Sequence, residues 1–353
     1  MKKLKAGIIG LGEVAQIIHL PILESLDDKF EVAALCDVSP GLLNWAGEHY
    51  RIKNLYDDAG ALVQQADLDV VFVLNSNEFH AENAIAAALQ GKHVLVEKPM
   101  VLTTADADAL IAAKNKTGVQ VIVGYMRRFA PAFTQAVEEM KSLEQINYAK
   151  IRAVIGPNRF FISQSSNVRR FDDIPSAANE KRQELFQQMI KQELGDIPPI
   201  LKNVYNVLCG LCCHDLSAMR ELIGMPRRVV SASQWGYSLL VTFEYENFHA
   251  TYEMVTDANG RFDAHIEVFG QTKQLKVQYN TPYIRHLPTT LTIGETANEE
   301  FKETVIRPTF TDPYTVELEY FYDVVTRGLT PKTSPEDYKQ DLALFKMIIE
   351  ALQ

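Results

Sequence analysis

The chain has 353 residues, 47% of them hydrophobic, and a formal net charge of −10. Such a length favours two domains, or one domain with a large appendage. An acidic chain without a basic block is a poor partner for nucleic acid or for an anionic membrane, and we expect neither. Nucleotide cofactors stay possible, because backbone amides rather than lysines can hold phosphates.

Membrane and secretory signals are absent from the sequence pattern. No apolar run approaches the roughly 18 residues that a spanning helix requires. The start, MKKLKAGIIGLG, runs directly into a glycine pattern, so we interpret it as a strand rather than a signal peptide. Three of the four cysteines crowd at 209, 212 and 213, unlike a disulfide framework. These features favour the reducing cytoplasm.

Short apolar runs alternate with helical patterns over the first 125 residues. Near-continuous Val/Ile runs separated by helices indicate a doubly wound parallel sheet covered on both faces. Ser39 ahead of Pro40 is typical of a helix N-cap, and Gly91 of a helix end. We expect strands at 6–11, 30–37, 69–75, 93–99 and 119–125, and helices at 14–26 (interrupted by Pro21), 40–50, 79–92 and 106–118.

The pattern changes after residue 126. Alternating apolar and polar residues from 228 to about 307 fit an antiparallel sheet. We expect helices at 176–195 with Ser176 as N-cap, at 197–224 ended by Gly224, and at 335–352. The sequence therefore predicts two domains, 1–125 and 126–353, with the last helix able to pack back toward the first domain.

GIIGLGEVA (7–15) contains the pattern G-x-G-x-x-A between a strand and a helix. Gly10 permits the tight turn, Gly12 lets the backbone approach a pyrophosphate, and Ala15 allows close packing of helix on strand. The phosphates would sit at the helix N-terminus, beside Glu13 and Val14. The motif alone is weak, but the strand–turn–helix context favours a dinucleotide site over a plain glycine turn.

Asp37 lies 22 residues after Ala15, at the end of the second strand. A ribose-binding acid is expected roughly 20 residues after this motif. A carboxylate there would repel a 2′-phosphate, and no arginine follows it closely in VSPGLL. We therefore expect NAD as cofactor, with NADP the weaker candidate.

With these motifs in place, the chain resembles the glucose–fructose oxidoreductase, inositol dehydrogenase and MocA (Gfo/Idh/MocA) family over nearly its whole length. The resemblance lies in GIIGLGEVA, in Asn77-x-x-His80 followed by AALQGKHVLVEKPM, in GYMRRFAPAF (124–133), and in a helix bearing His214. The EKP signature after GKHVLV is the most specific of these. GYMRRF looks especially like the inositol dehydrogenase branch.

The resemblance implies a Rossmann domain followed by an α+β domain built on a large open, mostly antiparallel sheet. The outer face of that sheet commonly forms a dimer interface, so we expect a homodimer or homotetramer. The nicotinamide and a carbohydrate-like substrate would meet between the domains, where Lys98 arrives. A lysine there can donate a hydrogen bond to a substrate hydroxyl. A surface Lys-Pro turn is the plain alternative.

Glu97 and Lys98 follow an apolar strand, a costly place for two charges unless something polar waits there. We expect both to lie at the cofactor, and Pro99 to hold Lys98 extended. The resemblance places Asn75, Asn77 and His80 in the loop beside the nicotinamide. Asn75 and Ser76 replace a common Thr-Pro pair, which changes that loop.

By resemblance, His214 takes the proton of the substrate hydroxyl while hydride leaves for the nicotinamide. The family usually carries a carboxylate four residues earlier, where this chain has Gly210. Positions i and i−4 share a helix face, whereas Asp215 is turned by about 100°. Ser217 likewise replaces a familiar acid. Gly210 therefore leaves a hole on the helix face where the acid would stand. Either this hole admits a larger substrate and His214 works with Lys98 alone, or the redox function is altered or lost.

Further residues are assigned less directly. Arg128 corresponds to a substrate-pocket arginine of inositol dehydrogenases, although Arg127 could equally be the inward one. Asn158 and Tyr283 are pocket candidates by position only. His214 itself could be a hydrogen-bonded core histidine. The run Cys209-x-x-Cys212-Cys213-His214 invites a zinc interpretation, but consecutive helical residues diverge, so we expect no metal site and buried cysteines instead.

The resulting hypothesis is a cytoplasmic NAD-dependent dehydrogenase acting on a secondary alcohol of a sugar, polyol or sugar derivative. One rival is an NAD-dependent glycoside hydrolase that oxidises a sugar carbon transiently. The missing acid at Gly210 keeps this rival open, since such enzymes handle protons differently. The other rival is a non-catalytic nucleotide-binding regulator, against which the joint presence of Lys98 and His214 argues.

Overall fold

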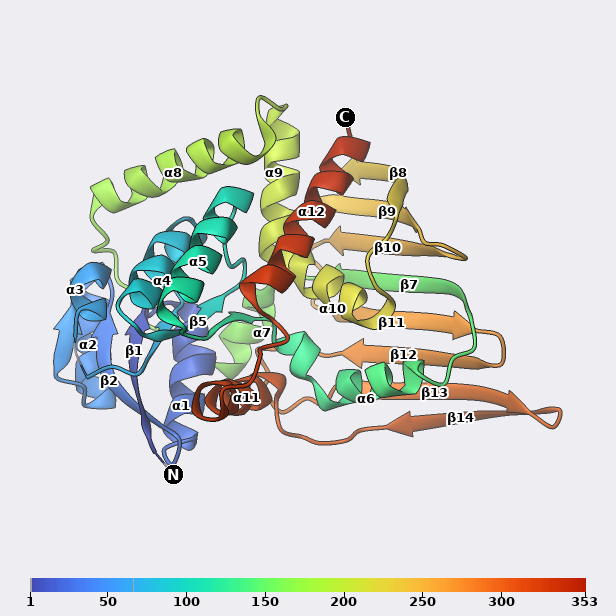
Figure 1. Ribbon diagram of the computed structural model, residues 1–353, viewed down its shortest axis with the longest axis horizontal. Helices are drawn as coiled ribbons and strands as arrows, with labels where there is room; N and C mark the ends of the chain where they lie inside the picture. Colours follow the sequence, from blue (N-terminus) through green and yellow to red (C-terminus); the bar gives the residue numbers. More distant parts are fainter. Residues whose placement is uncertain (1, 66) are drawn as a thin grey trace. The chain divides into compact units, whose positions relative to one another are not determined.

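The structure is a computed structural model that describes residues 2–65 and 67–353. Its contacts divide the chain into two compact units (Figure 1). The first unit comprises residues 1–124, 167–197 and 317–342, and the second comprises 125–166, 198–316 and 343–353. The sequence suggested two consecutive domains, whereas contacts group segments that are distant in the chain.

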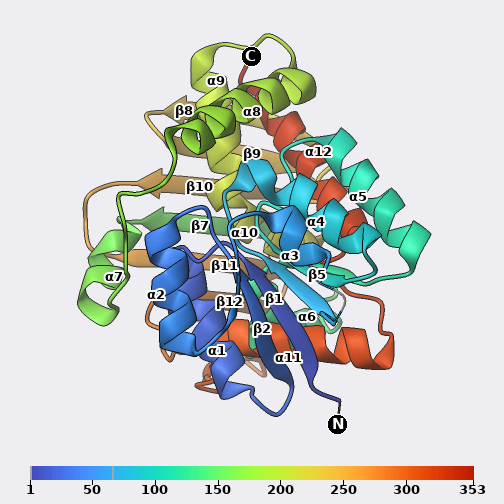
Figure 2. The ribbon, with the colours of Figure 1, turned by 90° about the vertical axis from the view of Figure 1, so that its left-hand side faces the viewer.

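The first unit is built on a six-stranded parallel sheet with the strand order β3-β2-β1-β4-β5-β6. Figure 2 labels β1, β2 and β5 of this sheet. This order is that of the Rossmann fold, which places a dinucleotide site at the carboxyl ends of the strands. The strands are β1 Leu4–Ile9, β2 Phe30–Cys36, β3 Asn54–Tyr56, β4 Val70–Val73, β5 His93–Glu97 and β6 Val121–Gly124.

Both faces of this sheet are covered, because the residues of β4 and β6 are all buried. The helices of the unit are α1 Leu20–Ser25, α2 Pro40–Tyr50, α3 Ala59–Val63, α4 His80–Leu89, α5 Thr104–Thr117 and α8 Ser176–Leu194. The Ser39 cap is confirmed, since its hydroxyl accepts the N–H of Leu42 at 3.1 Å. The Ser176 cap is wrong: Ser176 is the first residue of α8, which follows Pro175 without a side-chain cap.

The first helix differs from expectation. It begins with a π-helical turn, Ala15–His19, which passes directly into α1. Pro21 is the second residue of α1, directly after the π turn, and the helix continues beyond it to Ser25. The π turn matters because such turns often occur at functional sites, and this one follows the glycine loop.

Late segments of the chain complete the first unit. The carbonyl of Thr333 accepts the N–H of Val123 at 2.8 Å, so it covers part of the edge strand β6. The hydroxyl of Tyr338 donates to the carbonyl of Val101 at 2.7 Å. These contacts involve the residues just before and within α12 Pro335–Ala351, which follows α11 Pro313–Arg327.

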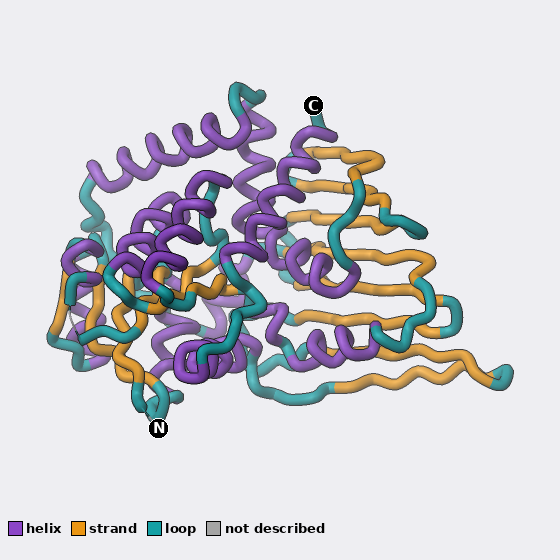
Figure 3. Tube along the Cα trace, in the orientation of Figure 1, coloured by secondary structure: helices purple, strands orange, loops and turns teal. Residues whose placement is uncertain are grey.

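The second unit carries an eight-stranded sheet with the order β14-β13-β12-β11-β7-β10-β9-β8, whose strands are labelled in Figure 1 and orange in Figure 3. Neighbouring strands are antiparallel except β7 and β10, which run parallel. The strands are β7 Ile146–Ile155, β8 Arg228–Trp235, β9 Ser238–Glu244, β10 His249–Thr256, β11 Phe262–Gly270, β12 Lys273–Tyr279, β13 Thr290–Ala297 and β14 Glu300–Ile306.

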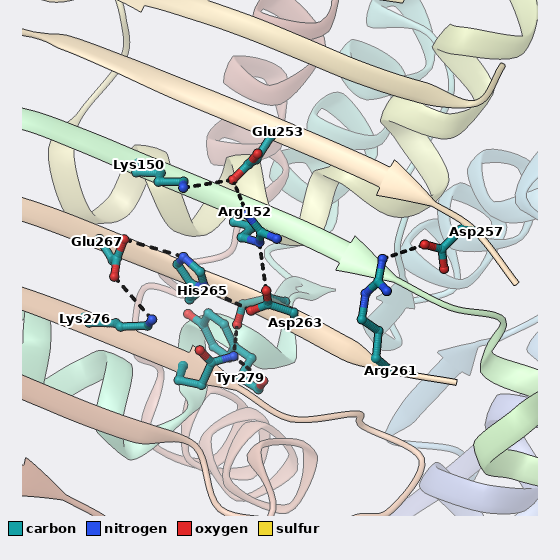
Figure 4. Close-up of polar contacts among 12 residues, drawn as sticks. Lys150, Arg152, Glu253, Asp257, Arg261, Asp263, His265, Glu267, Lys276 and Tyr279 are labelled. Carbon is teal, nitrogen blue, oxygen red and sulfur yellow. Dashed lines mark hydrogen bonds and ion pairs between the residues drawn. The ribbon is translucent and has the colours of Figure 1, made fainter. Parts of the chain in front are cut away.

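The two faces of this second sheet differ in chemistry. One face is apolar and packs against α6 and α10. The central strands of the other face carry an ionic network, drawn in Figure 4. Arg152 on β7 contacts Glu253 on β10 at 2.9 Å and Asp263 on β11 at 2.8 Å. His265 lies between Asp263 and Glu267 at 3.1 and 3.6 Å. We call this side of the sheet the ionic face.

The remaining helices of the second unit are α6 Pro131–Met140, α7 Asn158–Ser165, α9 Pro199–Val207 and α10 Cys213–Ile223. The expected single helix over 197–224 is interrupted by a π-helical turn, Leu208–Cys212, between α9 and α10. Its expected end is confirmed, because Gly224 adopts a φ of 84° at the C-terminus of α10.

Candidate active site

The glycine loop has the conformation that the motif requires. Gly10 adopts a φ of 92°, and a Cβ atom there would lie 2.5 Å from the backbone nitrogen of Asn75. Glycine is therefore the residue this position tolerates. At Gly12, by contrast, no atom lies within 4 Å of an added Cβ. The open space above Gly12 suits the close approach of a pyrophosphate to backbone N–H groups.

Asp37 lies directly beside this loop. One carboxylate oxygen accepts the N–H of Leu11 at 2.8 Å, and the other accepts the N–H of Ser39 at 2.9 Å. Burial raises the pKa of Asp37, against the two hydrogen bonds, which lower it. The loop and the acid are thus held together at the carboxyl ends of β1 and β2, where the ribose of a dinucleotide would lie.

Glu97 is held by protein groups on both oxygens. His19 Nε2 lies 2.9 Å from Oε1, and the N–H of Lys98 donates to Oε2 at 3.1 Å. Burial by itself would raise the pKa of Glu97, but the bond and charge of His19 and the charge of Lys98 outweigh it, so the pKa lies below its usual range. Glu97 therefore connects His19 in the first helix to the backbone of Lys98.

His19 is a partner that sequence reasoning missed. It is fully buried in the π turn that follows the glycine loop, 78 residues before Glu97. A histidine in an apolar stretch of helix gives a weak signal, because it is indistinguishable from a core histidine until its partner is known. The pairing means that the glycine loop and the end of β5 are mechanically linked.

His80 bridges two backbone carbonyls. Its Nδ1 lies 2.7 Å from the carbonyl oxygen of Pro99 and its Nε2 lies 2.9 Å from that of Asn75. Burial lowers the pKa of His80, against the two carbonyls, which raise it. A neutral imidazole donates one N–H, so it serves one carbonyl at a time. His80 fixes the loops after β4 and β5 to each other.

The remaining residues expected at the nicotinamide lie on the same loops. Asn75 and Asn77 belong to the segment between β4 and α4, with Asn77 the first residue of a 3₁₀ turn. The side-chain oxygen of Asn75 is buried and has no hydrogen-bond partner within the described part of the chain. A buried orphan acceptor beside the glycine loop fits a site that a polar ligand completes.

Glu13 and Val14 lie in the turn that leads to the first helix, and both are half-buried. Glu13 is not free to contact a ligand by itself, since its carboxylate pairs with Arg170 at 2.5 Å. Lys98 is half-buried at the end of β5, and the bond between Lys98 and Pro99 is cis.

His214 lies in the second unit and Lys98 in the first. His214 is buried in the first turn of α10, directly after the π turn. One turn of a π-helix contains between four and five residues. Gly210 therefore still lies about one turn before His214, as the sequence indicated. An added Cβ at Gly210 meets no atom within 4 Å, so the space that an acid would fill is open.

Asp215 is engaged elsewhere, as its position on the helix predicted. Its carboxylate is ion-paired with the buried guanidinium of Arg127, and it accepts a hydrogen bond from Tyr252 at 3.4 Å. Arg128 instead pairs with Glu221 at 2.5 Å. Both arginines are buried, and each is bound to a carboxylate of α10.

A pocket in the second unit distinguishes the two arginines. Arg127 lines it and Arg128 is outside its lining. The polar lining residues are Arg127, Tyr279, Asn280, Thr281, Arg285, Thr289, Asp312 and Tyr314. The hydroxyls of Tyr279 and Thr281 are buried and have no hydrogen-bond partner among residues 2–65 and 67–353. Such a lining suits a hydroxylated ligand or ordered water.

Asn158 and Tyr283, the two other pocket candidates, both lie outside the pocket lining. Asn158 begins α7, and the carbonyl of Tyr283 accepts a hydrogen bond from Ser165 at 3.3 Å. The residues that line the pocket instead of Tyr283 are its neighbours Thr281 and Pro282. Their signal in the sequence was a turn after a strand, which is common and unspecific.

The four cysteines are free and buried. Burial raises the pKa of Cys36 and Cys212, so both thiols stay protonated at neutral pH. Within the described residues, no group of three or more His, Cys, Asp and Glu could hold a metal ion. None of the helices that the structure describes is long and apolar enough to cross a membrane.

Known oxidoreductases are similar to this chain in sequence. The model of an oxidoreductase family with an NAD-binding Rossmann fold matches residues 4–125. Inositol 2-dehydrogenase of Salmonella typhimurium LT2 is 25% identical over 93% of this chain and 88% of its own length. Residues 4–125 therefore match the Gfo/Idh/MocA family of oxidoreductases, and the chain is similar to an inositol dehydrogenase over most of its length.

Solved structures agree in fold. Levoglucosan dehydrogenase, in complex with NADH and levoglucosan, has a TM-score of 0.75 at 18% identity, covering 99% of this chain and 97% of that chain. A Desulfitobacterium hafniense DCB-2 protein described as an NADPH-dependent oxidoreductase has a TM-score of 0.76 at 18% identity, covering 100% and 96%. The predicted fold class, a Rossmann domain with a second, mostly antiparallel sheet, is confirmed.

The family model and the similar dehydrogenases support a dehydrogenase that acts on CH–OH groups with a nicotinamide dinucleotide. The residues present fit such a cofactor: the gap above Gly12, the acid Asp37 and the orphan oxygen of Asn75 all lie on loops at the carboxyl edge of the first sheet. When bound, the cofactor supplies a hydride acceptor or donor.

Proposed function

We propose that this protein is an NAD-dependent dehydrogenase that oxidises a secondary alcohol of a sugar, polyol or sugar derivative. The observation that carries the proposal is the bond between the Asp37 carboxylate and the N–H of Leu11 in the glycine loop. It sets a negative charge at the ribose position of a dinucleotide. That charge favours the ribose hydroxyls of NAD over the 2′-phosphate of NADP.

The substrate class is supported by relatives and by the pocket. The similar proteins named above act on inositol and levoglucosan, both of which present several hydroxyls. In the second unit, Tyr279 and Thr281 line a pocket together with Arg127, and their buried hydroxyls have no hydrogen-bond partner within the described residues. A polyhydroxylated ligand can satisfy such groups, which an apolar ligand would leave unpaired.

Lys98 and His214 are the residues we propose for proton handling. His214 would accept the proton of the reacting hydroxyl as general base, while Lys98 donates a hydrogen bond to the same oxygen. Glu97 would act as a positioning residue, because it bonds the backbone of Lys98 rather than any reacting atom. Arg127, with Arg128 as the alternative, would bind substrate hydroxyls.

A screen of sugars and polyols with NAD, read as NADH absorbance, tests the function. We expect substrate-dependent net formation of NADH. The open space at Gly210 also favours a second candidate, an NAD-dependent glycoside hydrolase, since that site lacks the usual acid. Release of an aglycone from a glycoside without net NADH would establish the hydrolase. Cofactor binding without either product would leave only a regulator.

We also propose a cytoplasmic homodimer or homotetramer with the second sheet at its interface. Exposed apolar side chains flank the ionic face, with Trp235 and Leu240 at one edge of the sheet and Phe301 and Val305 at the other. A second copy would cover them, as symmetric interfaces of this kind do. Light scattering should give at least twice the chain mass at micromolar concentration, and a monomer would contradict the proposal.

A further inference from the structure

Residues 167–173, which we call the strap, belong to the first unit although they are far from it in sequence. The strap is a loop that precedes α8 (Figure 3). Its first contacts are with the helix after the glycine loop. Gln16 Nε2 donates to the carbonyl of Arg169 at 3.1 Å, and Gln16 Oε1 accepts the N–H of Arg169 at 2.9 Å. The strap is thereby fixed beside the glycine loop.

The other end of the strap reaches the N-terminus of α2. Asp173 accepts the N–H of Gly41 at 2.7 Å with one carboxylate oxygen, and its other oxygen accepts the hydroxyl of Ser39. Gly41 allows this approach, since an added Cβ would lie 2.6 Å from the ring of Phe171 and 2.8 Å from Asp173. Asp173 therefore takes the donors that the start of α2 presents.

Ser39 joins this carboxylate to the ribose-site acid. Its backbone N–H donates to Asp37 at 2.9 Å, while its hydroxyl donates to Asp173. Two carboxylates, one from the end of β2 and one from the strap, are thus bonded to the same residue. The charge of Asp173 also contributes to the raised pKa of Asp37, after the larger effect of burial.

We propose that Asp173 is a second specificity-determining residue, which together with Asp37 makes the nucleotide site reject a 2′-phosphorylated ribose. The inference rests on the proposed use of NAD. A 2′-phosphate on a ribose held by Asp37 would need anion donors close to the end of β2. Two such donors at the start of α2 are the Ser39 hydroxyl and the Gly41 N–H, which Asp173 occupies with a charge of the same sign.

The arginines of the strap are the groups that could oppose this effect, because arginine commonly accommodates a 2′-phosphate. Arg170 is paired with Glu13 at 2.5 Å, so its charge is already balanced. Arg169 is bound through its backbone to Gln16, next to the glycine loop and not at the start of α2. NAD has no phosphate at this position and meets no such conflict.

The test compares dissociation constants of NADH and NADPH for the wild type, Asp173→Asn and Asp37→Ala. Asp172→Asn is the matched control, an exposed acid one residue away. We expect Asp173→Asn to tighten NADPH binding about tenfold and to leave NADH within about twofold. Asp172→Asn should leave both unchanged. The same series with ADP-ribose and 2′-phospho-ADP-ribose should show the same ratios, since the effect belongs to the adenosine ribose.

The outcomes separate the inference from the proposed function. In one outcome, Asp37→Ala narrows the preference for NADH, but Asp173→Asn leaves the ratio of the NADPH and NADH dissociation constants within about twofold of wild type. Asp173 is then not a determinant, and the use of NAD stands. A wild type that binds NADPH more tightly overturns the use of NAD and the inference with it. Asp173 is exposed, so Asp173→Asn should fold, and its thermal unfolding checks this.

Discussion

The two sheets of this protein treat charge in opposite ways. In the first sheet both faces are covered, and charged groups appear at the strand ends, where Glu97 is buried against His19 with 7% and 0% of their side chains exposed. In the second sheet the ionic face carries its charges along the strands, and Arg152 and Glu253 keep 30% and 25% exposure. Burial makes each strand-end charge consequential, whereas solvent screens the ionic face.

Lys98→Met is the sharpest test of the charges at the strand ends of the first sheet. We expect kcat to fall by about 10²–10⁴, the usual worth of a positioned proton-handling group, with NAD affinity within a few-fold. Lys92→Met is the control, since Lys92 is a buried lysine at the opposite end of the same segment, bound to the carbonyl of Leu68 at 2.8 Å. Steady-state kinetics on the identified substrate decide it. Full turnover by the Lys98 variant would remove that residue from the mechanism.

The buried ion pair of the second unit should behave like the strand ends and unlike the ionic face. Arg127→Met leaves the Asp215 carboxylate buried without its guanidinium, so the free energy of unfolding should fall by about 3–5 kcal/mol. Arg128→Met is the matched variant, with a partner, Glu221, that is 17% exposed. We expect a smaller loss there in urea denaturation. Equal losses would show that burial of the partner does not set the cost.

Glu97→Gln removes charge from a strand end while keeping its shape. We expect a loss of about 1–3 kcal/mol at pH 7, because His19 then faces a neutral amide. The pKa of Glu97 lies below its ordinary value of about 4.3, so its stabilising contribution is present above that pH and is lost as the pH falls through the folded-state pKa. Lowering the pH from 7 to 3 should therefore reduce the free energy of unfolding of the wild type more than that of Glu97→Gln. Parallel curves would mean that Glu97 does not carry this charge.

The smallest effect should come from the ionic face. Arg152→Ala should change the free energy of unfolding by about 1 kcal/mol or less, and by less still in high salt, since its partners are partly solvated. The effect should grow with protein concentration if a second copy covers this face. Denaturation at two concentrations and two salt levels measures both. A large loss that is independent of concentration would contradict the contrast between the sheets.

Local signals predicted much of this molecule. Ser39 caps α2 because the cap depends on neighbours within one turn, and Gly10 needs its conformation for the turn it makes. The sheet expected over 228 to about 307 includes β14, although its residues are exposed along nearly the whole strand. The π turn at 208–212 was not predicted, because the apolar pattern of a helix does not reveal one extra residue within a turn.

Contacts between distant segments were beyond the sequence alone. The pairing of Glu97 with His19 and that of Ser39 with Asp173 join residues 78 and 134 positions apart. Without structure, residues 167–197 were grouped with the second domain by order along the chain, although contacts place them in the first unit. The Lys98–His214 pair remains a prediction.

The contact between Val123 and Thr333 has a consequence for biosynthesis. β6 emerges from the ribosome early, but the carbonyl that covers its N–H belongs to a residue 210 positions later. Domains generally fold from the N-terminus during synthesis, and an open edge strand is a template for pairing with another chain. Until Thr333 is synthesised, the N–H of Val123 therefore lacks this partner, and the nascent edge strand is open to pairing with another chain.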